Sequence, residues 1–409
     1  KNYWKVKDQV QNWPYTAWYD NPYYIVYERI NKNDQDLFNT NIYMSYDILK
    51  NLSLMFRTGY DHYTSINENR RSIGDSGVRK GYYAINESSG ASFNNDFIVN
   101  ANINWGDFLM DGVLGLSSYW YKDIYFNSNT RGGISVPGFY SLNASIERPN
   151  VSKSMDQKTV YSAYGKLGFS WKSAIFIEMT GRNDWSSTLP SSSRSYFYPS
   201  TSVSFLPTSF HNPFDDFLDF WKLRASWTIA KKDLGVYEIN SVYNVSTDVW
   251  NGFSTALYPT TLRDPKVKPE TERSYEFGTD FRFLGNRLGF DFTYFNRLRY
   301  DRLISAPVSV ASGFNNMITN TQEELLQKGI EITLSGKPIK NLNFEWESSL
   351  NGGFWHWYYH KLDPIYSSKD PRLGKGERYD KFFIIDWERD PNGNIVHQAG
   401  LPVKNKFWS

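Results

Sequence analysis

Apolar and polar residues alternate along much of this chain with a period of two, which is typical of β-strands that have two different faces. From Phe97 to Trp105 the odd positions are apolar, and Asn100, Asn102 and Asn104 lie between them. Residues 272–283 repeat the pattern with aromatic residues on one face. The alternation predicts twelve strands, most of them nine to thirteen residues long, at 40–48, 51–60, 96–105, 108–120, 158–171, 174–182, 195–206, 220–230, 272–283, 288–299, 328–336 and 341–355.

Strands of this length are longer than those of most soluble sheets and match what a tilted strand needs to cross a bilayer core. The connections between them also alternate in length. Tight connections are expected at 49–51, 106–107, 172–173, 284–287 and 337–340. Long loops are expected at 61–95, 121–157, 231–271 and 300–327, and intermediate connections at 183–194 and 207–219. Short turns at one end and long loops at the other are typical of outer-membrane barrels.

Aromatic residues cluster near the predicted strand ends. Those close to tight turns are Trp105, Phe108, Trp171, Trp221 and Phe283. Tyr60 and Trp120 are predicted to mark the opposite strand ends. Rings at these two levels would form the interfacial girdles of a membrane barrel. A general preference of aromatic residues for strand ends and sheet cores explains the same positions equally well.

The charged residues between the apolar positions restrict how such a sheet can be used. A charge that faces lipid near the midplane costs roughly 2–4 kcal/mol, so Asp280, Arg282, Glu331, Glu345 and Glu347 must face inward in a membrane barrel. Inward charges need water or a polar plug, which favours a wide barrel. Twelve strands with free edges would leave backbone groups unpaired in lipid. We therefore expect the chain to form part of a larger barrel.

Composition supports an all-β fold and excludes several kinds of site. Trp, Tyr and Phe make up 18% of the 409 residues, which favours β-structure. The chain has no cysteine, so it holds no disulfide, Cys-ligated zinc or thiol nucleophile. A net charge of +2 argues against nucleic acid as the main partner. Because the chain has no run of 18 apolar residues, no helix is predicted to cross a membrane.

The chain shows no motif for catalysis. Neither a Gly-x-Ser-x-Gly element nor a phosphate-binding or dinucleotide-binding glycine pattern is found, so we predict no enzyme and no cofactor. His356 and His360 are four residues apart in a segment expected to be strand end and loop, and no metal site is predicted there. Asp390 to Asn394 resembles the start of a calcium loop but lacks the glycine at the sixth position and the glutamate at the twelfth. A surface turn is favoured, with calcium as the alternative.

Aromatic residues among Asn, Ser and Thr in the predicted loops are candidates for ligand contact. They are Trp185, Trp250, Phe253, Tyr258 and Phe314. Aromatic faces with amides nearby suit sugar rings or peptide side chains. Packing of one loop against another, or against a partner lid, is an equally good interpretation.

Several longer motifs occur in a fixed order along residues 21–355. They are Asn21-Pro22-Tyr23-Tyr24, Gly181 to Pro190 (GRNDWSSTLP) with Tyr198-Pro199-Ser200, Leu223 to Trp227 (LRASW), Lys268 to Glu272 (KPETE) with Tyr275 to Gly278 (YEFG), and Gln327 to Ile332 (QKGIEI). Together they resemble the SusC/RagA family of TonB-dependent outer-membrane transporters. The chain departs from the family pattern after Trp227, where Ile229-Ala230-Lys231-Lys232-Asp233 replaces a glycine-rich turn.

The resemblance implies a fold and a function. The fold is all-β, a transmembrane antiparallel up-and-down β-barrel of 22 strands with long extracellular loops, and this chain supplies its central portion. Residues 1–39 are expected to be an extracellular loop or barrel segment, 40–355 barrel strands with long outer loops, and 356–409 an extracellular loop and the start of a further barrel region. The plug and the closing strand of the family are absent from this chain. The implied function is TonB-dependent import of oligosaccharides or peptides across the outer membrane of a Bacteroidota-like Gram-negative bacterium.

The resemblance also implies partners. These are a SusD-like surface lipoprotein, TonB acting through the plug, lipid or lipopolysaccharide, and a second transporter–lipoprotein pair in a homodimer; nucleic acid is not expected. Two alternatives remain open, namely a passive porin or scaffold barrel of an envelope complex, and a soluble β-rich glycan-binding or adhesin module. The soluble alternative requires that Val99, Phe277, Phe281 and Ile332 are buried against a second layer and that Arg282 and Glu331 face bulk solvent.

Overall fold

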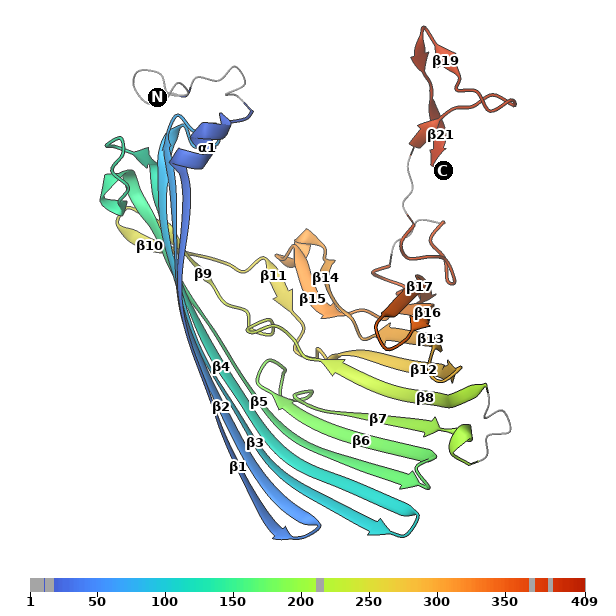
Figure 1. Cartoon of the computed structure of the whole chain (residues 1–409). Coiled ribbons are helices and arrows are strands. Elements are labelled where there is room, and N and C mark those ends of the chain that lie inside the picture. Colours follow the sequence, from blue (N-terminus) through green and yellow to red (C-terminus); the bar gives the residue numbers. More distant parts are fainter. Residues whose placement is uncertain (1–10, 12–17, 211–216, 368–371, 382–384, 409) are drawn as a thin grey trace. The chain divides into compact units, whose positions relative to one another are not determined.

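Antiparallel strands make up most of the computed structural model, which describes residues 11, 18–210, 217–367, 372–381 and 385–408 (Figure 1). Twelve strands form the main sheet in the order β1 (Arg29–Leu49), β2 (Leu52–Ile73), β3 (Lys80–Trp105), β4 (Phe108–Ile134), β5 (Ser145–Trp171), β6 (Ile175–Ser186), β7 (Ser195–Phe205), β8 (Leu218–Lys232), β12 (Glu270–Phe283), β13 (Leu288–Tyr300), β16 (Glu324–Lys340) and β17 (Glu345–Lys361). The α-helix in the described part of the chain is α1 (Pro22–Glu28).

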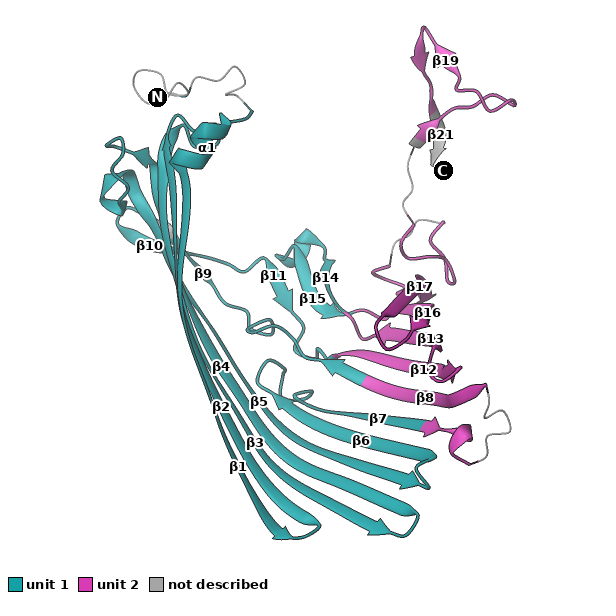
Figure 2. Cartoon of the chain, in the orientation of Figure 1, with its two compact units in different colours: residues 1–203, 230–269, 303–320 teal, residues 204–229, 270–302, 321–409 magenta. Residues whose placement is uncertain are grey.

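Shorter elements lie in the connections. They are the hairpin β9 (Asn244–Trp250) with β10 (Phe253–Leu257), the sheet of β11 (Thr261–Arg263), β15 (Asn316–Asn320) and β14 (Leu303–Pro307), the pairs β18 (Ile385–Trp387) with β21 (Lys404–Trp408) and β19 (His397–Gln398) with β20 (Leu401–Pro402), and the 3-10 turns η2 (Leu142–Ala144), η3 (Pro207–Ser209) and η4 (Val310–Ser312). The chain divides into two compact units (Figure 2), of which the first comprises residues 1–203, 230–269 and 303–320. The second comprises residues 204–229, 270–302 and 321–409.

All twelve predicted strands are confirmed, and so are the tight turns between β1 and β2, β3 and β4, β5 and β6, and β12 and β13. The turn between β16 and β17 is also short, but it lies at 341–344 and not at the predicted 337–340, because β16 continues to Lys340. The prediction of long loops at 61–95 and 121–157 is wrong. β2 continues to Ile73 and β3 begins at Lys80, while β4 continues to Ile134 and β5 begins at Ser145. These extensions are polar on both faces, so they show no alternation, but their backbone groups pair across the ladder regardless of the side chains.

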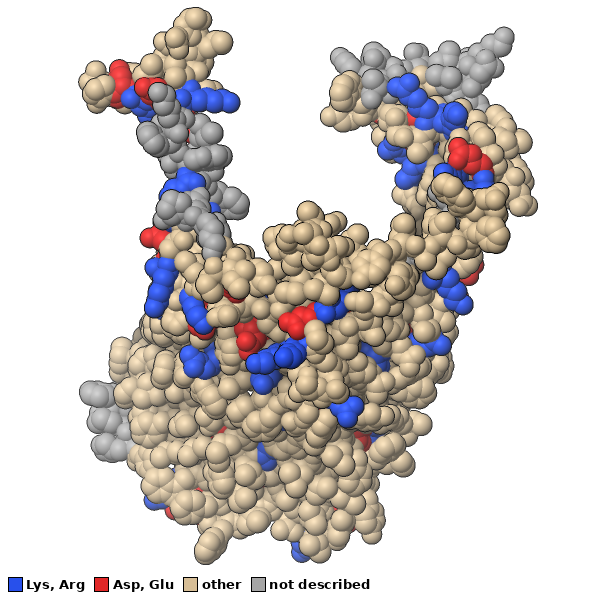
Figure 3. Space-filling view, turned by 180° about the vertical axis from the view of Figure 1, so that it is seen from behind, with Lys and Arg blue, Asp and Glu red and all other residues tan. Residues whose placement is uncertain are grey.

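In the first unit, the register places the apolar positions of neighbouring strands side by side. Val99 of β3 lies opposite Leu54 of β2 and Leu114 of β4. Leu114 in turn lies opposite Gly165 of β5, and this row, with the parallel rows through Phe97 and Leu167, is the apolar face of the unit. The side chain of Leu114 is 67% exposed. In Figure 3, the lower part of the molecule, around the tight turns of β1–β4, is mostly uncharged.

The second unit shows the same separation. Phe277 of β12 lies opposite Tyr294 of β13, which lies opposite Ile330 of β16. Phe277 is 53% exposed, so no second layer of the described chain covers it. On the other face, Arg224 Nη1 contacts Asp291 Oδ2 at 2.8 Å. The predicted separation of the faces is therefore confirmed, and the burial that a soluble module requires is not seen in the described residues.

Buried apolar clusters are small and lie where loops meet strand ends in the first unit. One contains Leu189, Tyr196, Leu234 and Val267. The other is built around Tyr83, Ile134 and Ala144. A sheet that keeps its apolar side chains on an uncovered face has little core of its own.

Aromatic rings form a row across β1–β4. Ring centroids of Phe38 and Tyr60 are 6.3 Å apart, those of Tyr60 and Phe93 are 4.6 Å apart, and those of Phe93 and Trp120 are 6.1 Å apart. The prediction that Tyr60 and Trp120 mark strand ends is wrong, because β2 and β4 continue to Ile73 and Ile134.

A second aromatic level lies beside the tight turns, where Phe108 stacks on Trp171 with their ring centroids 6.2 Å apart. Twelve residues separate Phe108 from Trp120 along β4. This is about 40 Å along the strand, or about 30 Å along the axis of a barrel whose strands tilt by about 40°. The spacing matches the thickness of a bilayer core. In the second unit, Trp221 stacks on Phe281 and Phe217 contacts Phe283.

Candidate functional site

The segment Gly181–Pro190 covers the end of β6 and the start of the loop after it. Alternation along β6 places Arg182 and Asp184 on the face opposite Met179, and the two side chains form an ion pair with Nε and Oδ1 2.8 Å apart. Arg182 Nη2 also donates to Ser162 Oγ of β5 at 2.9 Å, and Tyr198 Oη of β7 donates to Asp184 Oδ2 at 2.7 Å. This motif therefore joins three strands on the polar face.

Asp233 completes the arrangement from the loop that follows β8. Its carboxylate contacts Lys158 Nζ of β5 at 2.6 Å and accepts hydrogen bonds from Ser186 Oγ at 2.5 Å and from Thr188 Oγ1 at 3.2 Å. The sequence departs from the family pattern at this residue. In this chain the substituted segment holds the loop after β8 against β5 and β6.

An apolar cluster lies beside these polar contacts. Leu189 from the motif packs with Tyr196 of β7, Leu234 and Val267, each no more than 7% exposed. Ser193 Oγ donates to the backbone oxygen of Val267 at 2.5 Å. The loop after β6 and the long connection that follows β8 are thus fixed to each other.

These contacts frame a pocket of about 550 Å³ on the polar face of the first unit, which we call the wall pocket. Its lining is Arg57, Asn94, Asp96, Ser117, Tyr119, Lys158, Val160, Tyr164, Arg182, Asp184, Tyr196, Lys231, Lys232 and Asp233. Arg57 and Asp96 form a second ion pair at 2.6 Å. Tyr164 lies across Gly115 of β4, where an added Cβ would be 2.2 Å from the ring carbon Cζ. A concave site with aromatic rings and charged groups is suited to binding a polar ligand.

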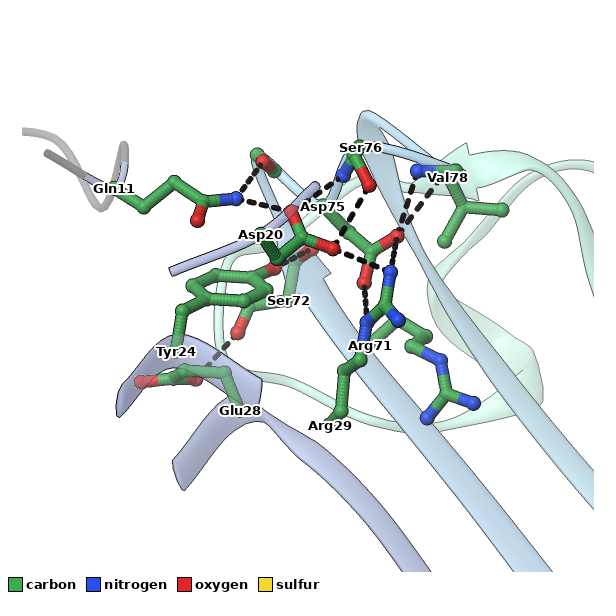
Figure 4. A network of polar contacts seen from close by, with 12 residues as sticks. Gln11, Asp20, Tyr24, Glu28, Arg29, Arg71, Ser72, Asp75, Ser76 and Val78 are labelled. Carbon is green, nitrogen blue, oxygen red and sulfur yellow. Dashed lines mark hydrogen bonds and ion pairs between the residues drawn. The ribbon is translucent and has the colours of Figure 1, made fainter. Parts of the chain in front are cut away.

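Helix α1 begins at Asn21-Pro22, where Asn21 Oδ1 accepts a hydrogen bond from the backbone N–H of Tyr23 at 3.0 Å. The buried Tyr24 donates its hydroxyl proton to the backbone oxygen of Ser72 at the end of β2, at 2.8 Å. Arg29 lies between two carboxylates and contacts both Asp75, at 2.6 Å, and Asp20 (Figure 4). We call the contacts of Asp20, Arg29 and Asp75 the carboxylate clasp.

The carboxylate clasp changes the ionisation of Asp75, which lies in the turn between β2 and β3. Burial alone would raise its pKa, but the hydrogen bond from Arg29, the backbone N–H groups of Gly77 and Val78, and the charge of Arg29 outweigh burial and hold the pKa of Asp75 below its usual value. The clasp thus ties α1 to the β2–β3 turn with a carboxylate that stays charged.

The structure separates the five predicted ligand-contact residues. Trp185 lies in β6 and not in a loop, opposite Tyr161 and on the apolar face with Met179. Trp250 and Phe253 pair across the β9–β10 hairpin, and both are largely exposed. Tyr258 contacts Phe314, with ring centroids 5.5 Å apart, and Tyr243 packs on the other side of Tyr258. None of the five lines the wall pocket.

The candidate calcium segment forms a turn. Asp390 Oδ1 accepts hydrogen bonds from the backbone N–H groups of Asn392 and Asn394, each at 2.9 Å. His356 and His360 both lie in β17, but His360 is at a β-bulge between the Leu325–Tyr359 and Glu324–Lys361 pairs, so alternation does not fix whether it shares a face with His356. No group of three metal-ligating side chains occurs in the described part of the chain. Among those residues, no helix has the length and apolar character that crossing a bilayer requires.

A sheet of long antiparallel strands with one apolar face, one polar face and aromatic rings at two levels is the wall of a large β-barrel. The chain belongs to the family described as TonB dependent receptor-like, beta-barrel, whose model matches residues 2–387. This confirms the family resemblance that the motifs predicted.

Relatives and solved structures agree with this assignment. TonB-dependent receptor P3 of Formosa agariphila is 24% identical over 350 residues, which cover 81% of this chain and 34% of the relative. TonB-dependent receptor SusC of Bacteroides thetaiotaomicron is 26% identical over 207 residues, which cover 48% of this chain and 20% of the relative. The chain thus spans about a third or less of these curated relatives. The structure of the RagAB peptide transporter superposes with a TM-score of 0.78 at 16% identity, covering 95% of this chain and 45% of that chain, and shows the shared fold.

Proposed function

We propose that this chain is part of the wall of an outer-membrane transporter that imports oligosaccharides or peptides with energy delivered by TonB. The observation that carries the proposal is the separation of the two faces in each unit, with Leu114 and Phe277 exposed on apolar faces and Arg182 and Arg224 on polar ones. In a bilayer the apolar faces contact lipid, and the polar faces line a solvated interior. Family membership adds TonB dependence.

The proposal includes the partners that the family resemblance implies. A plug outside this chain fills the barrel and receives force from TonB, and a SusD-like lipoprotein covers the extracellular end. Lipid or lipopolysaccharide surrounds the apolar face, and two transporter–lipoprotein pairs associate in an outer membrane of the Bacteroidota type. The relatives named SusC and the RagAB peptide transporter support this kind of assembly.

The transported molecule is an oligosaccharide or a peptide. The loop residues Trp250, Phe253, Tyr258 and Phe314 are proposed to contact it at the extracellular end. Trp185 is not included in this group, because it lies on the apolar face of β6.

Deleting the gene in the native host and measuring uptake of labelled oligosaccharides and peptides tests the proposal. Loss of uptake of at least one compound, together with the same loss when TonB is deleted, supports it. A passive porin predicts that uptake persists without TonB, so TonB-independent flux through the purified protein in liposomes would contradict it. Co-purification of a lipoprotein with the solubilised transporter tests the lid.

A further inference from the structure

The wall pocket contains more positive than negative side chains. Its basic residues are Arg57, Lys158, Arg182, Lys231 and Lys232, and its acidic residues are Asp96, Asp184 and Asp233. A pocket on the inner side of a barrel wall with this imbalance attracts anions, because field lines concentrate in a concave site.

The three carboxylates are already engaged by the protein. Asp96 is bound by Arg57, and Asp184 is bound by Arg182 and Tyr198. Asp233 accepts from Lys158, Ser186 and Thr188. Because each carboxylate is already paired with a cation of the protein, its negative charge is largely neutralised within the pocket.

Lys231 and Lys232 are different. Both line the pocket at the end of β8, and neither side chain forms an ion pair or hydrogen bond with any described residue. Lys231 is half-buried and Lys232 is exposed. Two lysines whose side chains have no described protein partner therefore line a pocket whose other charges are paired.

The pocket lining also offers neutral groups. Tyr119 and Tyr164 present aromatic rings, and Asn94 and Ser117 present an amide and a hydroxyl. The guanidinium of Arg182 lies 5.6 Å from the centre of the Tyr164 ring, which fixes that ring in place. Rings with hydroxyl and amide groups suit the body of a polar oligomer, while the lysines suit its charge.

We propose that the wall pocket binds a carboxylate-bearing ligand, with Lys231 and Lys232 holding the carboxylate. This rests on the proposed function, because the ligand is a molecule in transit through the interior. The same chemistry occurs in acidic oligosaccharides and in acidic peptides, and the experiment distinguishes the two sources.

The test measures binding by calorimetry to the full-length protein in detergent micelles at low salt. The probes are tetragalacturonate with its fully methyl-esterified, uncharged form, and Ala-Asp-Ala-Asp-Ala with Ala-Asn-Ala-Asn-Ala. The variant is K231Q/K232Q. The matched control is K122Q/K153Q, which removes the same charge from β4 and β5 outside the pocket.

At least one acidic probe is expected to bind about tenfold more tightly than its neutral counterpart, and the acidic probe that does so identifies the source. The affinity of K231Q/K232Q for the acidic probe is expected to be about tenfold lower than that of the native protein, which corresponds to the loss of a charge-assisted hydrogen bond. The affinity of K122Q/K153Q is expected to be unchanged. Raising the salt concentration to about 0.5 M should weaken binding of the acidic probe to the native protein and leave binding of the neutral probe unchanged.

Two results would overturn the proposal. One is equal binding of acidic and neutral probes, or acidic binding that K231Q/K232Q does not weaken. The other is that K231Q/K232Q conducts ions across planar bilayers without ligand while it still binds the acidic probe as tightly as the native protein. The two lysines would then hold the plug in place and would not bind the ligand. Binding in micelles needs no TonB, so failure of the pocket leaves TonB-dependent uptake intact, and failure of uptake leaves the binding result intact.

Discussion

Asp233 is the residue whose replacement tests the site geometry most sharply. Its carboxylate holds Lys158, Ser186 and Thr188 together, and the side chains of Lys158 and Asp233 are only 19% and 15% exposed. The change D233N keeps the size and one acceptor oxygen but removes the charge. Lys158 then remains a largely buried cation without its partner.

The magnitude follows from these contacts. Breaking a buried ion pair by removing one partner costs about 3–5 kcal/mol, and a hydrogen bond to a charged group contributes about 1.5–3 kcal/mol. Because the Asn oxygen still accepts one hydrogen bond, we expect D233N to lower the free energy of unfolding by about 2–3 kcal/mol. The double variant K158M/D233N should recover part of this loss, because it leaves no unpaired charge.

Urea unfolding of the full-length protein in micelles, followed by tryptophan fluorescence, measures the change. Cleavage by trypsin after the exposed Arg194 of the 187–194 loop provides a local readout and should become faster in D233N. The control is D380N, which removes the same kind of charge from an ion pair with Arg378 in which both side chains are more than 40% exposed. If D233N unfolded at the same urea concentration as D380N, with unchanged cleavage, the assigned role of Asp233 would be wrong.

Two further predictions concern Gly115 and the carboxylate clasp. G115V places a side chain where the Tyr164 ring lies and should lower the free energy of unfolding by about 1–3 kcal/mol. The control G352V should change this free energy little, because the space around a Cβ at position 352 is open. Equal effects of the two variants would contradict the packing of Tyr164 on Gly115. The pKa of Asp75 is lower in the folded protein than in the unfolded chain, where it is about 3.9. The contribution of Asp75 to holding α1 is therefore complete above pH about 3.9. It declines as the pH falls below this value and is lost below the pKa of the folded protein. Hydrogen exchange of the α1 amides should therefore speed up below about pH 4 in the native protein. D75N has no carboxylate to protonate at this position, so it shows only the intrinsic pH dependence of exchange and serves as the control. Identical pH profiles of the two proteins would exclude this role of Asp75.

Sequence alternation was sufficient to predict the twelve strands, because each has one face that excludes polar residues over its bilayer portion. It failed beyond the aromatic row, where Asp61 to Arg71 carry polar residues on both faces, and the backbone ladder together with side-chain hydrogen bonds maintains β2. The turn signal Gly74-Asp75-Ser76-Gly77 was present and could have located the true end of this hairpin. Continued alternation through Arg182 and Asp184 could likewise have placed Trp185 on the apolar face.

The wall pocket was harder to predict. The family motif pointed to Gly181–Pro190, but its main partners, Lys158 and Asp233, are 75 residues apart in the sequence. Asp233 also lies where the chain departs from the family pattern. Only the register of β5 and β6 and the path of the loop after β8 bring these side chains together, and neither can be read from one sequence.

The claim that the apolar face contacts lipid is tested most directly by spin labelling along β4. The chain contains no cysteine, so single cysteines can be placed at each position from 113 to 118 in the full-length protein, after removal of any cysteine elsewhere. The collision rate of the spin label with oxygen, which concentrates in lipid, should be high at positions 114, 116 and 118 and low at positions 113, 115 and 117. The collision rate with a water-soluble nickel complex should show the opposite order. Oxygen accessibility that is uniform along these positions, or highest at 113, 115 and 117, would contradict the account.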